Sequence, residues 1–186
     1  MVNLIFLNEI VIPRNSLVVL CGPAGSGKST WASTHFSPTQ VVSSDECRGL
    51  VFDDPADQSV SGHAFDVMHF IIEKRLALGR MTVADATNLR CEHRRTLIQI
   101  ARRFHFNTVA IVFDVSAETC LSRNAERHRK VPQDALMNQH ALLENTLKTI
   151  DKEGFNYVFR LNEDTQSNTP VRIGRYVSRR LPRPAP

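Results

Sequence analysis

The sequence predicts an α/β fold of three layers, in which helices cover both faces of a five-stranded parallel sheet. Short apolar runs of strand length alternate with longer segments whose apolar residues recur at helical spacing. The first predicted strand leads straight into a glycine-rich loop, and 186 residues make about one domain. Strands that alternate with helices form parallel sheets buried on both sides, so these observations favour a P-loop NTPase type of fold.

The strands are predicted from apolar runs that end at turn signals. The run Ser16–Leu20 lies between Pro13 and Gly22 and has no polar interruption after Ser16, which is typical of a buried central strand. The five predicted strands are 16–20, 40–43, 81–84, 108–113 and 157–161. Because ligands of such sheets bind at the carboxyl ends of the strands, the residues that follow each strand are candidates for a site.

The helices are predicted from apolar periodicity and from their stop signals. Ser37-Pro38 ends the first helix, Gly79 follows the second, and Gly154 stops the last, which begins at Pro132. The predicted helices are 28–36, 58–78, 92–105, 117–123 and one from 132 that ends before 154. The charged segment 124–131 between the last two helices is predicted to be a loop.

Composition excludes several classes of protein. Hydrophobic residues make up 42% of the chain and charged residues 23%, which is ordinary for a globular protein and unlike a disordered one. The four cysteines show no disulfide or zinc spacing, and no apolar run approaches the roughly 18 residues of a membrane helix. The opening segment has no basic region before its apolar stretch, so we expect a cytoplasmic protein without a membrane partner.

The net charge of +4 is unevenly distributed. The last 15 residues contain five arginines and no acid, and removing these five charges from +4 leaves −1 for residues 1–171. A case for a polyanionic substrate therefore depends on where the arginines lie. From Thr165 the chain turns to Thr, Ser, Pro and Arg without periodicity. We therefore predict a domain over 1–164 and a basic, Pro/Arg-rich tail or linker over 165–186.

The segment Gly22-Pro-Ala-Gly-Ser-Gly-Lys-Ser29 matches the phosphate-binding pattern G-x-x-x-x-G-K-[ST], between a predicted strand and a predicted helix. Its glycines let backbone N–H groups approach phosphates, and the helix N-terminus adds partial positive charge. Lys28 is predicted to reach the β- and γ-phosphates, and the Ser29 hydroxyl to bind Mg²⁺. The predicted nucleotide-binding residues of the loop are Gly22, Pro23, Ala24, Gly25, Ser26, Gly27, Lys28, Ser29 and Thr30. The expected cofactors are Mg²⁺ and ATP, GTP or another NTP.

A carboxylate and an arginine follow the second predicted strand. Asp45 stands at the strand end, beside the P-loop if the strands pair in chain order, and Arg48 comes three residues later. If the segment turns helically, the two side chains face the same way. Asp45 would then take the proton of an acceptor hydroxyl, and Arg48 would bind an acceptor phosphate or the transferring group. The alternative is that Asp45 only caps a helix and Arg48 is a surface charge.

The third predicted strand ends in Asp85, followed by Thr87 and Asn88. A carboxylate here could hold Mg²⁺ through water, and the two neutral side chains would add hydrogen-bond donors to the site. Asp114, after the fourth predicted strand, is a competing metal ligand. We prefer Asp85, although these three residues could instead cap a turn.

The charged loop is rich in arginine. Arg123 and Arg127 have i, i+4 spacing, so one helical face would present both, and Arg129 follows closely. Such a segment suits a lid that closes on a triphosphate and supplies positive charge to the transition state. The alternative is a solvated charged surface.

Taken in order, these motifs resemble those of the polynucleotide 5′-kinases. The matching segments are Cys-Gly22-Pro-Ala-Gly-Ser-Gly-Lys-Ser-Thr30, Ser-Ser-Asp45-x-x-Arg48-Gly-Leu, Asp85-Ala-Thr-Asn88-Leu, Phe113-Asp-Val and Arg123-Asn-x-x-Arg127 with Val131-Pro132. The chain is most similar to the kinase domain of bacterial RNA-repair polynucleotide kinase/phosphatases. The likeness runs from about Val18 to Leu161.

The resemblance implies transfer of the γ-phosphate of an NTP to the 5′-OH end of RNA or DNA in nucleic-acid repair. Lys28, Asp45, Arg48, Arg123 and Arg127 would be the catalytic residues, with Asp45 as general base and the last two arginines on the donor phosphates. Arg129 is a looser match. In the repair enzymes this domain precedes phosphatase and ligase modules, which are therefore possible partners.

Two other functions fit the sequence. A small-molecule P-loop kinase, acting on a sugar, nucleoside or antibiotic alcohol, shares the loop and the arginine lid. A non-catalytic nucleotide-responsive module could instead use the arginine-rich tail to bind nucleic acid.

Overall fold

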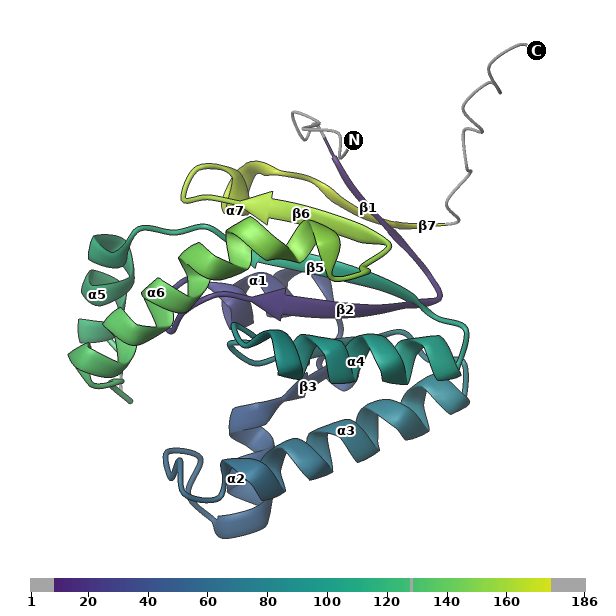
Figure 1. Cartoon of the computed structure of the whole chain (residues 1–186), viewed down its shortest axis with the longest axis horizontal. Helices are drawn as coiled ribbons and strands as arrows, with labels where there is room; N and C mark the ends of the chain where they lie inside the picture. The colour runs from purple at the N-terminus through teal and green to yellow at the C-terminus, as the bar shows by residue number, and fades with distance from the viewer. Residues whose placement is uncertain (1–8, 128, 175–186) are drawn as a thin grey trace.

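The computed structural model describes residues 9–127 and 129–174, and its centre is a parallel five-stranded sheet (Figure 1). Its strands are β2 (Ser16–Cys21), β3 (Val41–Ser43), β4 (Thr82–Asp85), β5 (Asn107–Phe113) and β6 (Tyr157–Leu161). Each predicted strand is present, with its ends within one residue of those expected. The order across the sheet is β3-β4-β2-β5-β6, and all four pairings are parallel. The predicted fold class is thus confirmed.

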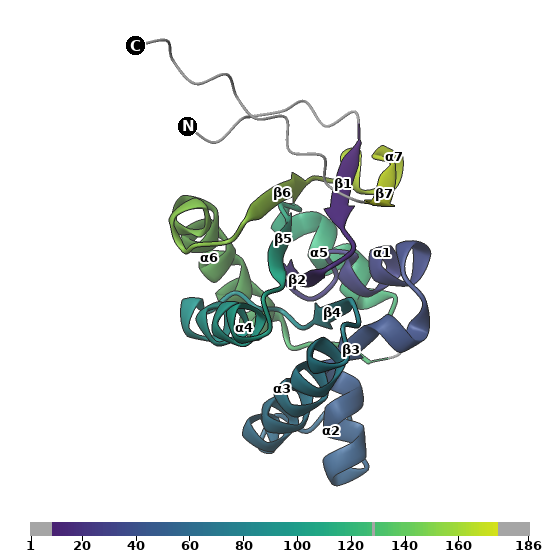
Figure 2. The ribbon, with the colours of Figure 1, turned by 90° about the vertical axis from the view of Figure 1, so that its right-hand side faces the viewer.

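Helices cover both faces of this sheet, as the sequence predicts (Figure 2). One face carries α3 (Ser61–Ala77), α4 (Cys91–Arg103) and α6 (Gln133–Thr149), and the other carries α1 (Lys28–His35) and α5 (Ala117–Ala125). Leu17 and Val19 of β2 belong to the core on the first face, and Val18 and Leu20 to the core on the second. Side chains of a strand alternate between faces, so β2 is buried on both sides. In the described residues, no helix is both long and apolar enough to cross a membrane.

One further helix, α2 (Ser44–Phe52), follows β3 without a loop. Its N-cap is Ser43, whose hydroxyl accepts hydrogen bonds from the backbone N–H groups of Asp45 and Glu46. The segment that carries Asp45 and Arg48 is therefore helical, which is the condition under which their side chains are expected to face the same way. The alternative that Asp45 is the capping residue is wrong. Short 3₁₀ turns occupy Pro38–Gln40 and Ile150–Lys152.

The structure differs from the expected tail over residues 165–174. Thr165–Asn168 forms α7, and Val171–Gly174 forms β7, which pairs in parallel with β1 (Ile10–Pro13). The reason is tertiary: β7 pairs with a strand about 160 residues earlier, beside the buried side chains of Ile10 and Ile12. Neither four-residue strand is long enough to show a pattern of its own. Residues 175–186 of the predicted tail lie outside the described residues.

The strand order decides which acidic residue lies next to the phosphate loop. β4 lies between β2 and β3, and Asp85 pairs in register with Leu20 at the end of β2. Asp45 belongs to the segment after β3, one strand further out. The expectation from chain order, that Asp45 follows the strand beside the P-loop strand, is therefore corrected. The chain crosses over through α2 and α3 after β3, so that β4 lies between β3 and β2.

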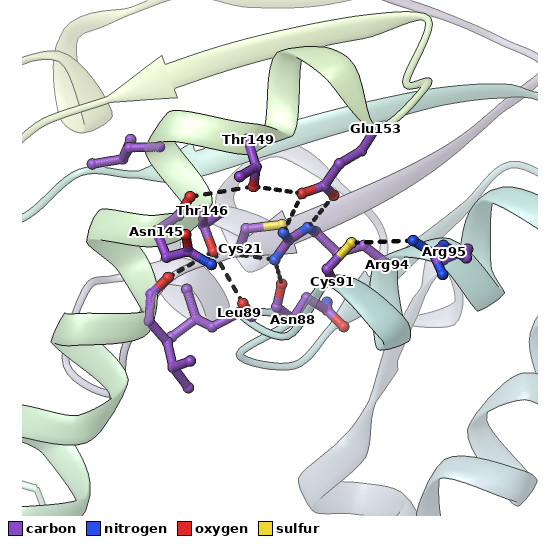
Figure 3. Close-up of polar contacts among 12 residues, drawn as sticks. Cys21, Asn88, Leu89, Cys91, Arg94, Arg95, Asn145, Thr146, Thr149 and Glu153 are labelled. Atoms are coloured by element: carbon purple, nitrogen blue, oxygen red, sulfur yellow. Dashed lines mark hydrogen bonds and ion pairs between the residues drawn. The ribbon is translucent and has the colours of Figure 1, made fainter.

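A buried arginine joins the loop after β4 to helix α6 (Figure 3). The side chain of Arg94 on α4 is 1% exposed and donates to both carboxylate oxygens of Glu153, at 2.7 and 2.5 Å. Its Nη1 donates to the carbonyl of Asn88 at 2.9 Å and to the hydroxyl of Thr146 at 3.1 Å. The Thr146 hydroxyl donates in turn to the carbonyl of Leu89 at 3.0 Å. One guanidinium therefore holds α4, α6 and this loop together.

The same loop is hydrogen-bonded to the phosphate loop. The side chain of Asn88 donates to the carbonyl of Leu20 at 2.8 Å, and the N–H of Gly22 donates to the carbonyl of Thr87 at 2.9 Å. Asn88 has a φ of 46°, a left-handed conformation that asparagine adopts more readily than most residues. A continuous set of hydrogen bonds therefore runs from α6 to the first residue of the phosphate loop.

Both members of the buried ion pair remain charged. Burial by itself would raise the pKa of the Glu153 carboxyl, but hydrogen bonds from Arg94 and Thr149 outweigh it and hold the pKa below its ordinary value. Burial by itself would lower the pKa of Arg94, but Glu153 holds it above the ordinary value. Removing one partner would leave the other charge buried and uncompensated.

Replacing Glu153 with Gln should lower the free energy of unfolding by about 3 to 5 kcal/mol at neutral pH, because the Arg94 charge would lose its counter-charge. The pKa of Glu153 is depressed in the folded protein. Its stabilising contribution is therefore present above the unfolded value of about 4.3 and is lost as the pH falls through the folded value. The stability difference between wild type and variant should shrink in acid, which urea unfolding at neutral and acidic pH measures.

The matched control is Asp151→Asn, which breaks the partly exposed ion pair between Asp151 and Arg160. Exposed pairs contribute about 1 kcal/mol or less. Equal losses of stability in the two variants would contradict the role assigned to burial.

Candidate active site

The phosphate loop turns tightly between β2 and α1. Gly25 and Gly27 have φ angles of 79° and 94°, in the left-handed region that favours glycine. A Cβ on Gly25 would collide with the backbone carbonyl of Cys120 on α5, and one on Gly27 would come within 2.7 Å of the Gln166 side chain. The loop is therefore enclosed between α5 and α7, and only glycine fits at these two positions.

Lys28 is the first residue of α1, and only 8% of it is exposed. Its ammonium group donates to the carbonyl of Pro23 at 2.7 Å and to the hydroxyl of Ser26 at 3.4 Å. Burial lowers its pKa to about 8, against an opposing effect of the nearby carboxylate of Asp85. No carboxylate forms an ion pair with Lys28 in the described part of the chain. Its charge is thus held inside the loop, where an anion would stabilise it.

Most of the predicted site residues of the loop line one large cleft of about 960 Å³. Six of them line it: Ala24, Gly25, Gly27, Lys28, Ser29 and Thr30. The other three, Gly22, Pro23 and Ser26, form the base of the loop and do not line the cleft. Gly22 carries the bond to the loop after β4, and Pro23 accepts the hydrogen bond from Lys28.

The remaining predicted site residues line the same cleft. They are Asp45 and Arg48 on α2, Asp85 at the end of β4, Arg123 on α5, and Arg127 in the charged loop. Because α5 ends at Ala125, the expectation that one helical face presents both Arg123 and Arg127 is wrong. Asp114, the competing metal ligand, is exposed and does not line it. The carboxylate of Asp45 and the ammonium of Lys28 therefore border one space.

Asp45 lies between two guanidinium groups. It forms ion pairs with Arg48 on its own helix and, at 2.7 Å from Oδ2 to Nη1, with Arg129 of the charged loop. Arg48 is buried, and its Nε donates to the carbonyl of Pro55 at 2.9 Å, so the alternative of a surface charge is wrong. Burial and the neighbouring Arg129 lower the pKa of Arg48. The side chain of Asp45 is 45% exposed, which leaves its carboxylate accessible from the cleft.

Asp85 and Ser29 supply the oxygen atoms that a hard cation would need. Asp85 is buried at the carboxyl end of β4, and Ser29 is exposed on the first turn of α1. Across the described ranges, no three His, Cys, Asp or Glu residues form a metal-binding group. Thr87 lines the cleft, as expected, whereas Asn88 is fully buried and bonds only to backbone carbonyls. The expected donor role of Asn88 is therefore replaced by a structural one.

The charged loop is closed at its base by Asn124. The amide of Asn124 donates to the carbonyl of Val131 at 2.8 Å and accepts from the N–H of Val131 at 3.0 Å. The segment between them carries Arg127 and Arg129 over the cleft. Within the described ranges, neither Arg123 nor Arg127 forms an ion pair with an acid, which leaves their charges available to a ligand.

Two glutamines contact the phosphate loop and are missing from the predicted site. Gln139 on α6 accepts a hydrogen bond from the N–H of Ala24 at 2.8 Å. With its amide oxygen toward Arg123, Gln166 on α7 accepts from both terminal nitrogens of that arginine and donates to the carbonyl of Ser26, each at 3.0 Å. No sequence signal marks either residue, because both contacts come from helices more than 100 residues away from the loop in the chain.

Comparisons with known proteins give the same fold. None of the curated proteins matches the chain in sequence. Among solved structures, similar ones include a putative kinase from Chloroflexus aurantiacus (16% identity, TM-score 0.56, 80% of this chain and 88% of that one). Another is the APS kinase CysC of Mycobacterium tuberculosis with AMPPNP and APS (16% identity, TM-score 0.52, 82% of this chain and 91% of that one). A third is the Pnkp1/Rnl/Hen1 RNA repair complex (20% identity, TM-score 0.63), where the likeness covers 74% of this chain and 46% of that chain.

Identities this low establish the fold alone. The family model described as "AAA domain" matches residues 17–146, which include the phosphate loop, Asp45, Asp85 and the arginines of the charged loop. Because the match covers most of the chain, the chain belongs to this AAA-domain family of P-loop proteins, and its fold is kinase-like.

Proposed function

We propose that the protein is a polynucleotide 5′-hydroxyl kinase, which transfers the γ-phosphate of an NTP to the 5′-OH end of RNA or DNA. The observation that carries this proposal is the shared cleft, which both Lys28 and Asp45 line. Transfer to an alcohol needs a base and a phosphate-binding cation that border one space. The choice of a 5′-OH end as the acceptor comes from the order of the motifs, which resembles that of the polynucleotide kinases.

The chemistry follows from the positions of the side chains. The N–H groups of the loop and the ammonium of Lys28 hold the β- and γ-phosphates. The oxygen of the 5′-hydroxyl bonds to the γ-phosphorus, and Asp45 accepts the proton that this hydroxyl loses. The bond between that phosphorus and the bridging oxygen then breaks, and the electron pair leaves with the nucleoside diphosphate. Arg48, Arg123 and Arg127 compensate the negative charge that spreads over the equatorial oxygens.

The site also fits a magnesium ion. Mg²⁺ in phosphotransferases is held by one or two protein oxygens together with phosphate oxygens and water. Ser29 and Asp85 would hold it here, because their oxygen atoms border the cleft and the phosphate loop. When bound, the ion would neutralise charge on the β- and γ-phosphates.

The wall formed by α3 and the start of α4 suits a nucleoside. Phe65 and His93 both line the cleft, with ring centroids 4.8 Å apart, and Arg90 lies beside them. Burial lowers the pKa of His93, so its ring is largely neutral near pH 7. Aromatic faces stack on nucleobases, and an arginine beside them can contact a phosphate. This wall favours an acceptor that carries both a base and a phosphodiester.

The competing acceptor is a small alcohol, because the structural neighbours include an APS kinase and a gluconokinase as well as an RNA repair protein. To distinguish a polynucleotide acceptor from a small alcohol, the protein is incubated with γ-labelled ATP or GTP, Mg²⁺ and each acceptor. We expect label at the end of a 5′-OH oligonucleotide and none on the same strand with a 5′-phosphate. Label on gluconate, a nucleoside or another small alcohol, without labelled oligonucleotide, would overturn the proposal.

Asp45→Asn tests the base. The amide keeps the size of the side chain but accepts no proton, so we expect transfer to fall by about 10² to 10⁴-fold while NTP binding changes little. Asp66→Asn is the control, since Asp66 is exposed on α3 and does not line the cleft. Initial rates of transfer and nucleotide titration measure the two properties. Full activity of Asp45→Asn would exclude this mechanism, and no turnover by the wild-type protein would favour a non-catalytic binding module.

Lys28→Ala tests the phosphate contact. Loss of one preorganised cation at the transferring phosphate should lower kcat/KM by about 10²-fold or more. Lys74→Ala is the matched control, because Lys74 lies exposed on α3 over the ring of Phe70. Steady-state kinetics with the oligonucleotide acceptor give the comparison, and similar values for the two variants would refute the assignment.

A further inference from the structure

A second hollow, of about 710 Å³, lies at the edge of the sheet opposite the phosphate loop. Three arginines line it, together with neutral side chains that can donate hydrogen bonds, and none of its lining residues is acidic. These six residues, Arg14, Arg75, Arg80, Ser37, Thr39 and Gln40, define what is called the basic hollow here. It shares no residue with the cleft described above.

The topology explains why these residues meet. Arg14 precedes β2, Gln40 precedes β3, and Arg80 precedes β4. In a parallel sheet the amino ends of all strands lie at one edge, and the carboxyl ends, which carry the phosphate loop, lie at the other. The basic hollow is therefore separated from the loop by the length of β2, which is about 20 Å for six residues.

The positive charge in the hollow lacks a counter-charge. Arg75 is half-buried at the end of α3, and its guanidinium donates to the hydroxyl of Thr82 at 3.0 Å and to the carbonyl of Met81 at 3.1 Å. Burial and the neighbouring Arg80 both lower the pKa of Arg75. Residues 9–127 and 129–174 offer no acid within ion-pair distance of Arg14, Arg75 or Arg80.

Several other arginines of the fold are paired with an acid. Arg94, Arg103, Arg160 and Arg172 each form an ion pair with a glutamate or an aspartate. In the hollow, by contrast, three guanidinium groups without such a partner in the described residues gather among hydroxyl and amide groups. A multivalent anion with several oxygen acceptors would satisfy such a site.

We propose that the basic hollow binds backbone phosphates of the nucleic-acid strand whose 5′ end occupies the cleft. This inference rests on the proposed function for the identity of the strand. The segment 22–44, which leads from the phosphate loop through α1 to Ser37, Thr39 and Gln40 of the hollow, contains no Asp or Glu, and α1 exposes the hydroxyls of Ser33 and Thr34. A separation of about 20 Å corresponds to about six phosphates at 3.4 Å each, so only longer strands reach the hollow.

The test measures how the affinity for a single-stranded 20-mer depends on salt. Each arginine that contacts a phosphate adds about 0.7 to the slope of log Kd against log salt, through release of a counterion. We expect Arg14→Gln and Arg80→Gln each to lower that slope by about 0.7, and the double variant by about 1.4. Arg95→Gln, an exposed arginine on α4 that lines neither site, should leave it unchanged. A 5′-phosphorylated strand is used, so that no transfer occurs during binding.

Varying the length of the acceptor tests the proposal independently of the salt dependence. The two variants should phosphorylate a 5′-OH dinucleotide as well as wild type does, and should show a raised KM for a 5′-OH 20-mer. If no acceptor is phosphorylated at all, the proposed function fails, but the salt slopes still decide whether the hollow binds a strand.

Unchanged slopes in Arg14→Gln and Arg80→Gln, or an equal fall in Arg95→Gln, would overturn the proposal. A hollow that serves free phosphate would instead bind inorganic phosphate in a titration that the double variant abolishes, with the slopes for the 20-mer unaltered. That outcome would also overturn it.

Discussion

The site depends on one buried charge. Arg94 is taken almost fully out of water, and a guanidinium in that position is tolerated only if a carboxylate and further acceptors surround it. Glu153, the carbonyl of Asn88 and the hydroxyl of Thr146 meet this requirement, and each comes from a different segment. The cost of leaving any of these groups unpaired therefore fixes the positions of the segments that carry them.

The consequence reaches the phosphate loop and the charged loop above it. The segment held by Arg94 is bonded to Leu20 and Gly22, the residues that lead into the phosphate loop. Helix α6, held by the same guanidinium, also touches the phosphate loop through Gln139 and begins where the loop 124–131 ends. The phosphate loop and the charged loop are thus tied to one network of hydrogen bonds, which is the kind of support that the proposed catalytic site would need.

The cleft places many cationic side chains around the accessible carboxylate of Asp45. Lys28, Arg48, Arg123, Arg127 and Arg129 all border it, and the carboxylate of Asp45 is paired with two of them. In the proposed reaction Asp45 would exchange these partners for an acceptor hydroxyl, and the freed guanidinium groups would face the phosphoryl oxygens. The basic hollow repeats the excess of positive charge at the opposite edge of the sheet, without a base and without a phosphate loop. The two regions are therefore suited to different tasks, chemistry in one and binding in the other.

The sequence by itself determined the five strands of the central sheet, the helices that cover it and the identity of the phosphate loop, but not β1, α2, α7 and β7. Apolar runs and stop signals report local burial and backbone preference, so each predicted strand was found within one residue, and the glycines of the loop mark conformations that only glycine adopts readily. Tertiary structure alone decided which elements are neighbours. The insertion of β4 between β2 and β3, the pairing of β1 with β7, and the contacts of Gln139, Gln166 and Arg129 join residues far apart in the chain. Their physical cause is the burial of charge and apolar surface between distant segments, and no local pattern records it.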